Sequence, residues 1–330
     1  MKLKVIITLI LLLVISVTAT FALTTTSREK KNFMLDKGAT LTVISNEGFI
    51  EVNEWNRNEA EVTIVKKVRA RSNREARELF DNIQIDIEHS KDRLYIRHFS
   101  DSQTNSISLL KLLDPDNWSF SNRVISVSFS LKVPREVDLR LESDEGDVKV
   151  HGTEGDIEIN VDEGDVEVES IEYRNMIVKI DEGDFRGRDI QGEAGRMKIY
   201  SDEGEVNIVD GKHEFLDIKC DEGDIYLKKI EVTELSIYTD EGDIDVDLPD
   251  ERVKNNYYNL ETDEGDVRIY APAEIAMKYK LITEDGRIRS KFDIDIREYD
   301  DGARAIGEIG KRGIELTIYT DEGTISIYDK

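Results

Sequence analysis

The stretch LSIYTDEGDIDV, residues 235–246, contains the pattern that decides the fold. Apolar and polar residues alternate on both sides of the tetrapeptide Asp-Glu-Gly-Asp, and this period of two predicts two short strands that each bury one face. The glycine permits the positive φ of a tight corner, and the acidic residues beside it favour turns. The stretch therefore predicts a strand, a corner and a second strand.

This pattern recurs about ten times between residue 144 and the C-terminus. The motif glycines are Gly146, Gly155, Gly164, Gly183, Gly204, Gly223, Gly242, Gly265, Gly286 and Gly323. Without Gly155, which lies nine residues from each neighbour and suggests a second corner in the first coil, the spacings are 18, 19, 21, 19, 19, 23, 21 and 37 residues. The sequence Asp300-Asp301-Gly302 inside the longest interval looks like a degenerate copy.

A hairpin meander would explain a single copy equally well. A nearly constant period favours coils that stack and return to the same place, because the loops of a meander are free to vary. We therefore expect an all-β, single-chain β-solenoid (β-helix) with about 20 residues per coil, capped by a small N-terminal α+β segment.

The chain divides into three predicted segments: 1–22, 32–123 and 124–330. In the first, Lys2 and Lys4 precede an apolar run over residues 5–17 and then small residues, which is typical of a signal peptide. An uncleaved N-terminal anchor is the alternative, because the apolar stretch approaches the roughly 20 residues that span a bilayer. Either form predicts an extracytoplasmic protein that is periplasmic, secreted or displayed at the cell surface.

Segment 32–123 is predicted to be a strand-rich cap with one helix. Ser72-Asn73-Arg74-Glu75 matches a capping box, and Ala76, Leu79, Phe80 and Ile83 then fall on one helical face. The polar residues 101–122 predict a long loop. Segment 124–330 is the predicted acidic repeat domain.

Charge is unevenly distributed along the 330 residues, whose net charge is −26. Residues 1–140 have a net charge of +3, and residues 141–330 have a net charge of −29. Nucleic acids and anionic lipids are polyanions, so the repeat half should repel both. Membrane contact is therefore expected only through an uncleaved N-terminal segment, and cations or basic molecules are suitable partners.

Several parts of the sequence together resemble a known family. They are residues 39–55, the helix with its capping box, residues 126–134 before the first motif, the Gly-Asp repeats and residues 313–318 before the last motif. These features resemble the bacterial putative-adhesin family of envelope β-solenoid proteins over nearly the whole chain after residue 22. The resemblance implies a β-helical stack outside the cytoplasm and no catalytic residues. The Asp-Glu pair before most of the glycines departs from the small residues usual in that family and makes this chain unusually acidic.

Stacking would bring the carboxylates of the motifs into rows. At the usual strand spacing of ~4.8 Å, two equivalent carboxylates repel by roughly 0.9 kcal/mol even in water. Bound Ca²⁺ is one way to relieve this repulsion, since hard cations take oxygen ligands; splaying into solvent with diffuse counterions is the other. A cation ladder would use the aspartates two positions before and one position after the glycines. These are Asp162, Asp165, Asp181, Asp184, Asp221, Asp224, Asp240, Asp243, Asp263 and Asp266.

The remaining reactive residue types give no specific catalytic pattern. His89, His98, His151 and His213 are scattered, and carboxylate pairs suited to a glycosidase are unavoidable in so acidic a stack. Cys220 occupies the position three before a motif glycine that elsewhere usually takes Thr or Ser, so we expect it to be a small inward packing residue. No cofactor is expected apart from Ca²⁺.

Tyrosines fall on outward positions of the predicted strands, where they either fill gaps between strands or bind a glycan or a partner. They are Tyr200, Tyr226, Tyr238, Tyr270, Tyr319 and Tyr328. The sequence favours a non-enzymatic, adhesin-like binding or scaffold protein of the cell envelope, with cation-dependent binding as an option, whose partner is a surface glycan or protein. A polysaccharide-acting β-helix enzyme is the alternative, and a structural spacer or envelope-stress accessory protein is the third.

Overall fold

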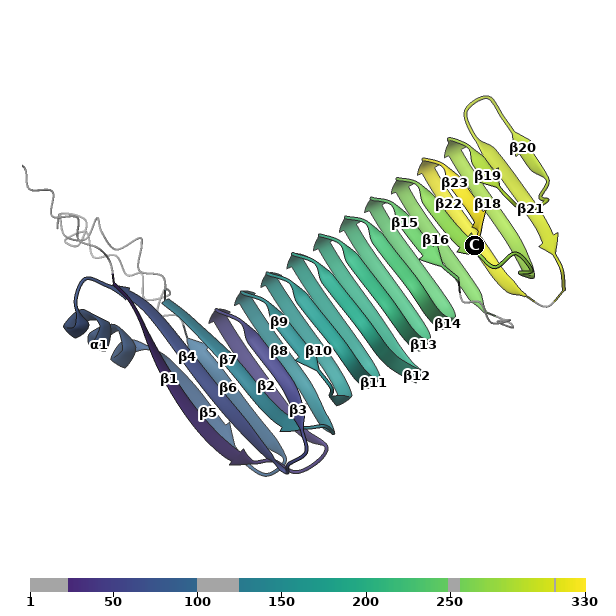
Figure 1. The fold of residues 1–330 in the computed structure, drawn as a ribbon. Coiled ribbons are helices and arrows are strands. Elements are labelled where there is room, and N and C mark those ends of the chain that lie inside the picture. The colour runs from purple at the N-terminus through teal and green to yellow at the C-terminus, as the bar shows by residue number, and fades with distance from the viewer. Residues whose placement is uncertain (1–22, 100–124, 249–255, 312) are drawn as a thin grey trace, which may run out of the picture.

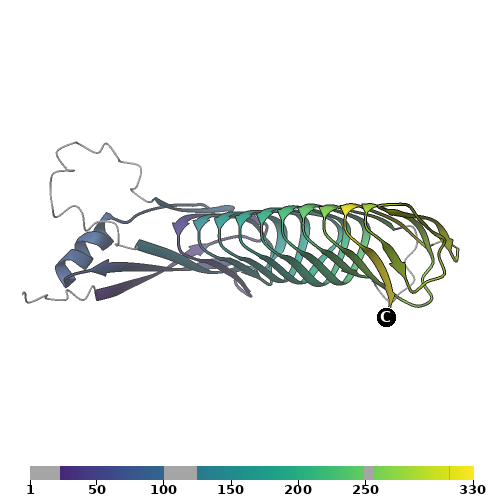
Figure 2. The ribbon, with the colours of Figure 1, turned by 90° about the horizontal axis from the view of Figure 1, so that it is seen from above.

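The structure is a computed structural model and describes residues 23–99, 125–248, 256–311 and 313–330. The predicted signal segment 1–22 and the predicted loop 101–122 lie outside these ranges. The described chain is a rod of stacked strands with one helix, α1 (Asn73–Asn82), at the end where the chain starts (Figures 1 and 2). Among the helices in this part of the chain, none has the length and apolarity needed to cross a membrane.

Parallel strand pairing produces the rod. β8 (Val137–Glu145) pairs in parallel with β10 (Glu154–Glu163), which pairs in parallel with β11 (Val166–Glu182). In each pair, residues that hold the same place relative to the motif glycine lie side by side, such as Glu145, Glu163 and Glu182. A meander would give antiparallel pairs here, so the prediction of a β-solenoid is confirmed.

The strands form two faces that meet at the glycine corner. The first face, which precedes the corner, runs in the spatial order β6 (Arg93–Phe99), β2 (Ala39–Glu47), β8, β10, the second halves of β11, β12 (Phe185–Glu203), β13 (Val206–Glu222) and β14 (Ile225–Glu241), and then β16 (Tyr257–Glu264), β22 (Ile314–Glu322) and β18 (Met277–Asp285).

The second face follows the corner. Its order is β7 (Ile125–Pro134), β3 (Ile50–Trp55), β9 (Val148–His151), the first halves of β11 to β14, and then β15 (Ile244–Asp247), β17 (Val267–Ala271), β23 (Ile325–Asp329) and β19 (Ile288–Ser290).

Antiparallel strands close both ends of the rod. At the N-terminal end, β4 (Glu59–Ala70) joins β7, β1 (Leu23–Met34) joins β4, and β5 (Gln84–His89) joins β6. At the other end, β21 (Ala303–Ile309) joins β18, and β20 (Ile296–Glu298) joins β21. These strands cover ends at which another chain could otherwise pair with the stack.

The core consists of rows of inward side chains that stack from coil to coil. One such row contains Leu141, Ile159, Val178, Ile199 and Ile218, all fully buried. Because alternate residues point inward, each strand adds two or three apolar side chains to this core, and hydrophobic burial stabilises each coil only when its neighbours are present.

At the N-terminal end of the rod, the spatial order of the coils differs from their order in the sequence. Residues 39–55, which the sequence analysis places in the cap, form a coil of the stack, because β2 pairs with β8 and β3 pairs with β9. Gly48 is its corner, with a φ of 118° and an amide that donates to the carbonyl of Glu145 at 2.8 Å.

The order also differs at the far end, where the last coil in the sequence is not the last in space. β22 lies between β16 and β18, and β23 lies between β17 and β19 (Figure 1). The expected extra coil at Gly302 is wrong, because the residues after it form β21, which runs antiparallel to β18. Gly155 is not a corner either, since it lies within β10 opposite Tyr173.

The predicted helix is confirmed together with its cap. Ser72 is extended, with φ −154°, and its side chain accepts a hydrogen bond from the amide of Glu75 at 3.2 Å. The carboxylate of Glu75 accepts from the amide of Arg71 at 2.6 Å. On the predicted apolar face, Ala76 is buried, while Leu79 and Phe80 pack against the core.

Candidate binding surface

The motif glycines form a column along the edge where the two faces meet. Gly183, Gly204 and Gly223 have φ values of 141°, 137° and 152°, which residues other than glycine rarely adopt. A Cβ atom at any of the three would lie 2.1–2.2 Å from the carbonyl oxygen of the glycine in the preceding coil. Both the backbone conformation and the packing of coil on coil therefore require glycine.

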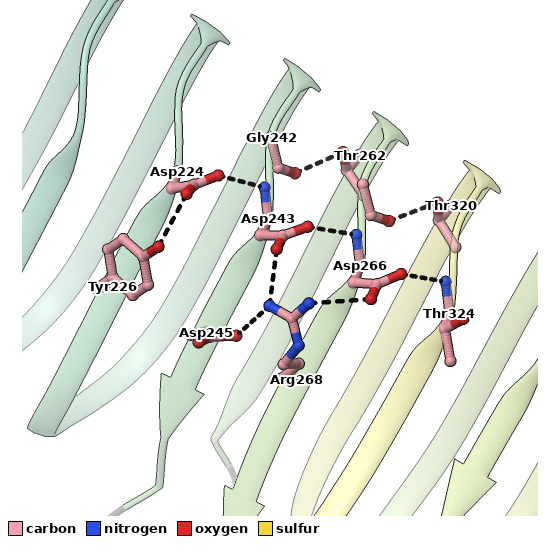
Figure 3. Close-up of polar contacts among 11 residues, drawn as sticks. Asp224, Tyr226, Gly242, Asp243, Asp245, Thr262, Asp266, Arg268, Thr320 and Thr324 are labelled. Carbon is pink, nitrogen blue, oxygen red and sulfur yellow. Dashed lines mark hydrogen bonds and ion pairs between the residues drawn. The ribbon is translucent and has the colours of Figure 1, made fainter.

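The aspartates after the glycines form a second column. The carboxylate of Asp165 accepts a hydrogen bond from the amide of Asp184 at 3.1 Å, and the carboxylate of Asp184 accepts from the amide of Glu205 at 2.9 Å. The bonds repeat between Asp224 and Asp243 and between Asp243 and Asp266, each at 2.8 Å (Figure 3). One carboxylate oxygen in each of these coils thus satisfies a backbone amide of the next coil.

Arginines neutralise part of this aspartate column. Arg268 contacts Asp243 at 2.7 Å, Asp266 at 2.9 Å and Asp245 at 3.3 Å, and Figure 3 shows its guanidinium among these three carboxylates. Arg186 contacts Asp165 and Asp184 at 2.6 Å each. The sequence analysis missed both arginines, although their shared position three residues after a motif glycine was a usable signal.

These contacts change the acidity of individual carboxyl groups. Burial acts to raise the pKa of Asp165, but hydrogen bonds from Arg186 and the amide of Asp184 outweigh it and leave the pKa below its usual value. Burial raises the pKa of Asp245, although Arg268 acts in the opposite direction. The column is therefore a set of paired carboxylates rather than a row of free anions.

The aspartates two positions before the glycines have a different environment. Asp162, Asp181, Asp221 and Asp240 are exposed, and Asp263 is half-buried. Within the described residues, no group of three or more His, Cys, Asp or Glu side chains is arranged to hold a metal ion. The structure thus separates the ten predicted ladder residues into a column bonded to amides and a row directed toward solvent.

Small polar side chains line the inside of the corner. Thr262 and Thr320 are fully buried, and their hydroxyls donate to the carbonyls of Gly242 at 3.2 Å and Gly265 at 3.3 Å. Cys220 occupies the same position and its thiol lies 3.6 Å from the carbonyl oxygen of Gly204. Burial raises the pKa of Cys220 to about 11, so the thiol stays protonated and its predicted packing role is confirmed.

The buried histidines are also structural. His213 is 2% exposed, and its Nδ1 lies 2.6 Å from the hydroxyl of Tyr173. Burial lowers the pKa of His213 to about 4, and burial with the nearby charge of Lys66 lowers the pKa of His98 to about 4. Both rings are therefore neutral at pH 7 and are enclosed by the core.

Three of the six outward tyrosines, Tyr226, Tyr270 and Tyr328, lie on the second face, near the far end of the rod. Tyr226 donates its hydroxyl to Asp224 at 2.8 Å, and the ring of Tyr270 stacks on that of Tyr328 with centroids 5.3 Å apart. A groove of about 460 Å³ lies between Tyr226 and Tyr270, and Asp245 and Asp247 form its floor. A second groove, of about 440 Å³, lies on the first face beside Phe215 and Tyr257.

Comparison with known proteins decides the family. The family model described as Toastrack DUF4097 matches residues 24–328. The chain belongs to the Toastrack DUF4097 family. The match covers nearly all of the chain after residue 22, and the resemblance to envelope β-solenoids is confirmed. No curated protein sequence matches the chain significantly.

Solved structures similar to this Toastrack chain include the following three. A "putative cell adhesion protein" from Clostridium sporogenes is 14% identical, with 92% of this chain and 100% of that chain covered and a TM-score of 0.27. A "putative lipid binding protein" from Parabacteroides distasonis is 11% identical, with 91% and 96% covered and a TM-score of 0.40. A "putative adhesin" from Bacteroides fragilis is 10% identical, with 91% and 97% covered and a TM-score of 0.35.

Proposed function

We propose that this chain is a non-enzymatic, adhesin-like binding or scaffold protein of the bacterial cell envelope. The observation that supports the proposal best is the regularity of the two outward faces, on which side chains stand in rows at constant register along the rod. Such a surface suits many weak contacts that add up, whereas catalysis needs one concave site with convergent reactive groups.

The thiol and the imidazoles with shifted pKa values also support a role without catalysis. Among the described residues, the thiol and the two imidazoles with strongly shifted pKa values are Cys220, His98 and His213, and all three are buried in the core. A thiol or imidazole that acts in catalysis would be expected in a cleft that a substrate can reach. The position outside the cytoplasm rests on the signal predicted in residues 1–22.

Cations enter this proposal as counterions of the exposed acidic row. The amide bonds and arginines satisfy the aspartates after the glycines, whereas most aspartates before the glycines are exposed, where mobile counterions can reach them. Monovalent salt and Ca²⁺ should both reduce the repulsion within that row.

Sedimentation with washed cells of the native host and with their envelope fragments tests the proposal. The full chain should pellet with both, and an unrelated acidic protein of similar net charge should stay in the supernatant. Mass spectrometry of the mature protein should find a start near residue 20 or 23, or an intact N-terminus in the membrane fraction. Absence of the chain from the pellets, or release of reducing sugars from the envelope fragments, would contradict a binding role without catalysis.

A further inference from the structure

The groove on the second face differs from the rest of the acidic repeat domain. It lies across β14, β15 and β17, whose registers place Tyr226 beside Asp245 and place Asp247 beside Tyr270. The four-residue strand β15 therefore forms a polar floor, and a tyrosine stands on the strand at each side. Asn207 and Val209 of β13 extend the groove toward the N-terminal end.

Both tyrosines are held in place by the protein itself. The hydroxyl of Tyr226 is fixed by its hydrogen bond to Asp224, and Tyr270 is supported from behind by Tyr328, whose ring lies at 20° to it. All three rings are half-buried. A ligand would thus meet ordered aromatic surfaces and would not have to order them on binding.

The polar groups of the groove are paired and nearly balanced in charge. Asp247 contacts Lys330 at 2.6 Å, and Asp245 contacts Arg268 at 3.3 Å. Among the residues that line the groove, two cationic side chains, Lys228 and Lys330, stand against two carboxylates, Asp245 and Asp247. This balance is unusual in a segment, residues 141–330, whose net charge is −29.

These features exclude most charged ligands. A metal cation would have to displace Arg268 and Lys330 from the carboxylates of the floor, and a phosphorylated or otherwise anionic ligand would be repelled by the acidic rod around the groove. A neutral ligand with flat apolar faces and many hydroxyl groups suits both the aromatic sides and the polar floor. The groove volume lies within the range of about 300–1,000 Å³ that is usual for small-molecule sites.

We propose that this groove binds a neutral saccharide segment, with sugar rings packed against Tyr226 and Tyr270 and hydroxyls bonded to the floor. The proposal rests on the proposed binding function and names its ligand class. Asp245 and Asp247 form ion pairs with Arg268 and Lys330, and in this proposal their carboxylates orient sugar hydroxyl groups by accepting hydrogen bonds. The proposed role of the groove is to bind the saccharide without cleaving it.

Calorimetric titration of the full chain with maltotriose, cellotriose and chitotriose tests the site. At least one of these neutral probes should bind, and a Tyr226→Ala/Tyr270→Ala variant should bind it about tenfold more weakly. Tyr200→Ala/Tyr238→Ala, which removes outward tyrosines from the first face, is the matched control and should bind as the unchanged chain does. Val209→Arg, which fills the groove without removing a tyrosine, should also weaken binding. This variant tests the site if the double variant fails to fold.

Several results would overturn the saccharide site. They are the absence of binding by all three probes, equal binding by the groove variants, cleavage of a bound probe, and tighter binding of tri-lysine than of any sugar. Dimerisation of the chain that Tyr226→Ala/Tyr270→Ala abolishes would instead assign the groove to a second copy. If the groove variants still pellet with envelope fragments while no sugar binds, this inference fails and the proposed function stands. If a sugar binds and nothing pellets, the proposed function fails.

Discussion

At the scale of single residues, the motif glycines are fixed by two separate constraints. Their φ values lie outside the range that other residues adopt readily, and the carbonyl of the preceding glycine occupies the place of a Cβ atom. The flanking carboxylates are fixed less strictly, because Glu205 replaces aspartate after Gly204 and its carboxylate accepts from the side-chain amide of Asn207 at 3.1 Å.

The first prediction concerns Gly223. Gly223→Ala should lower the free energy of unfolding by about 3 kcal/mol or more, because backbone strain of about 1–3 kcal/mol adds to a contact that the two coils cannot relieve without moving apart. Gly38→Ala is the matched control, since Gly38 also has a positive φ, 74°, but nothing lies within 4 Å of its added Cβ. Urea unfolding of both variants measures the difference, and equal losses would refute the steric part of the explanation.

A second corner in the central coils has no glycine. Ser170, Asp189, Asp210 and Lys229 each lie six residues after a motif glycine and have φ values of 51–57°. This left-handed conformation costs roughly 1–2 kcal/mol for a residue other than glycine. The corner could not be predicted from sequence because these four residues share no chemical type.

Lys229→Gly should therefore stabilise the protein by about 1 kcal/mol, the relief of the left-handed strain less the greater entropy of glycine in the unfolded chain. The ion pair lost with Asp210 is exposed and long, at 4.0 Å, so it contributes little. Lys219→Gly, at an exposed strand position of the same coil, should instead destabilise the chain by about 0.5–1 kcal/mol. Thermal unfolding of the two variants measures the change in stability. A loss of stability in both variants would mean that the corner is not strained.

At the scale of elements, three neighbouring coils share one buried polar pair. Tyr173 of β11 extends across Gly192 of β12, where an added Cβ would lie 2.2 Å from its ring, and reaches His213 of β13. Gly192 and His213 are direct neighbours in the register of β12 and β13. The tyrosine and the histidine thus bridge strands that are not adjacent.

This pair predicts a pH dependence of stability. Burial lowers the pKa of His213 to about 4, whereas an unfolded histidine titrates near 6.5. Between these values the unfolded chain binds a proton that the folded chain does not, so stability falls as the pH falls through this window. The loss between pH 7 and pH 5 should be about 2 kcal/mol for this residue, and His98 adds to it with the same sign.

His213→Gln removes that part of the loss. The variant should be less stable than the unchanged chain at pH 7, because the buried pair with Tyr173 is altered, but its stability should change less between pH 7 and pH 5. His151→Gln, on the surface, is the control and should leave the slope unchanged. Urea unfolding at several pH values gives the two slopes, and parallel slopes for His213→Gln and the unchanged chain would contradict the role of this histidine.

The strands themselves could be predicted from sequence, but some of their neighbours could not. Alternation and glycine spacing give β11 to β14 because sequence neighbours are also spatial neighbours there. The strands in residues 39–55 and 314–329 instead pair with strands that are far from them in the sequence. The sequence of a parallel strand does not identify the strand with which it pairs. The corner at Gly48 could not be recognised from the motif either, since Asn46 and Phe49 stand where most of the other motifs carry acids.

At the scale of the whole molecule, the acidic edge is only partly compensated. The carboxylate rows follow from the sequence alone, but their pairing with amides and with Arg186 and Arg268 depends on the stacking register. The groove was hidden for the same reason, because Tyr226, Asp245 and Tyr270 belong to three coils. The row before the glycines carries a carboxylate in nearly every coil, and this row predicts how the rod responds to salt.

The melting temperature should rise with NaCl, because counterions screen the repulsion between exposed aspartates such as Asp181, Asp202 and Asp221. CaCl₂ at the same ionic strength should raise it by a similar amount, since no described cluster of side chains is arranged to hold a metal ion. Asp202→Asn removes the repulsion with two neighbours and should raise the melting temperature in low salt by about 2 °C. The salt response of this variant should be smaller. A much larger effect of CaCl₂ than of NaCl, reduced by the same substitution, would instead locate specific calcium sites on this row, and the predicted cation ladder would then be confined to the aspartates before the glycines.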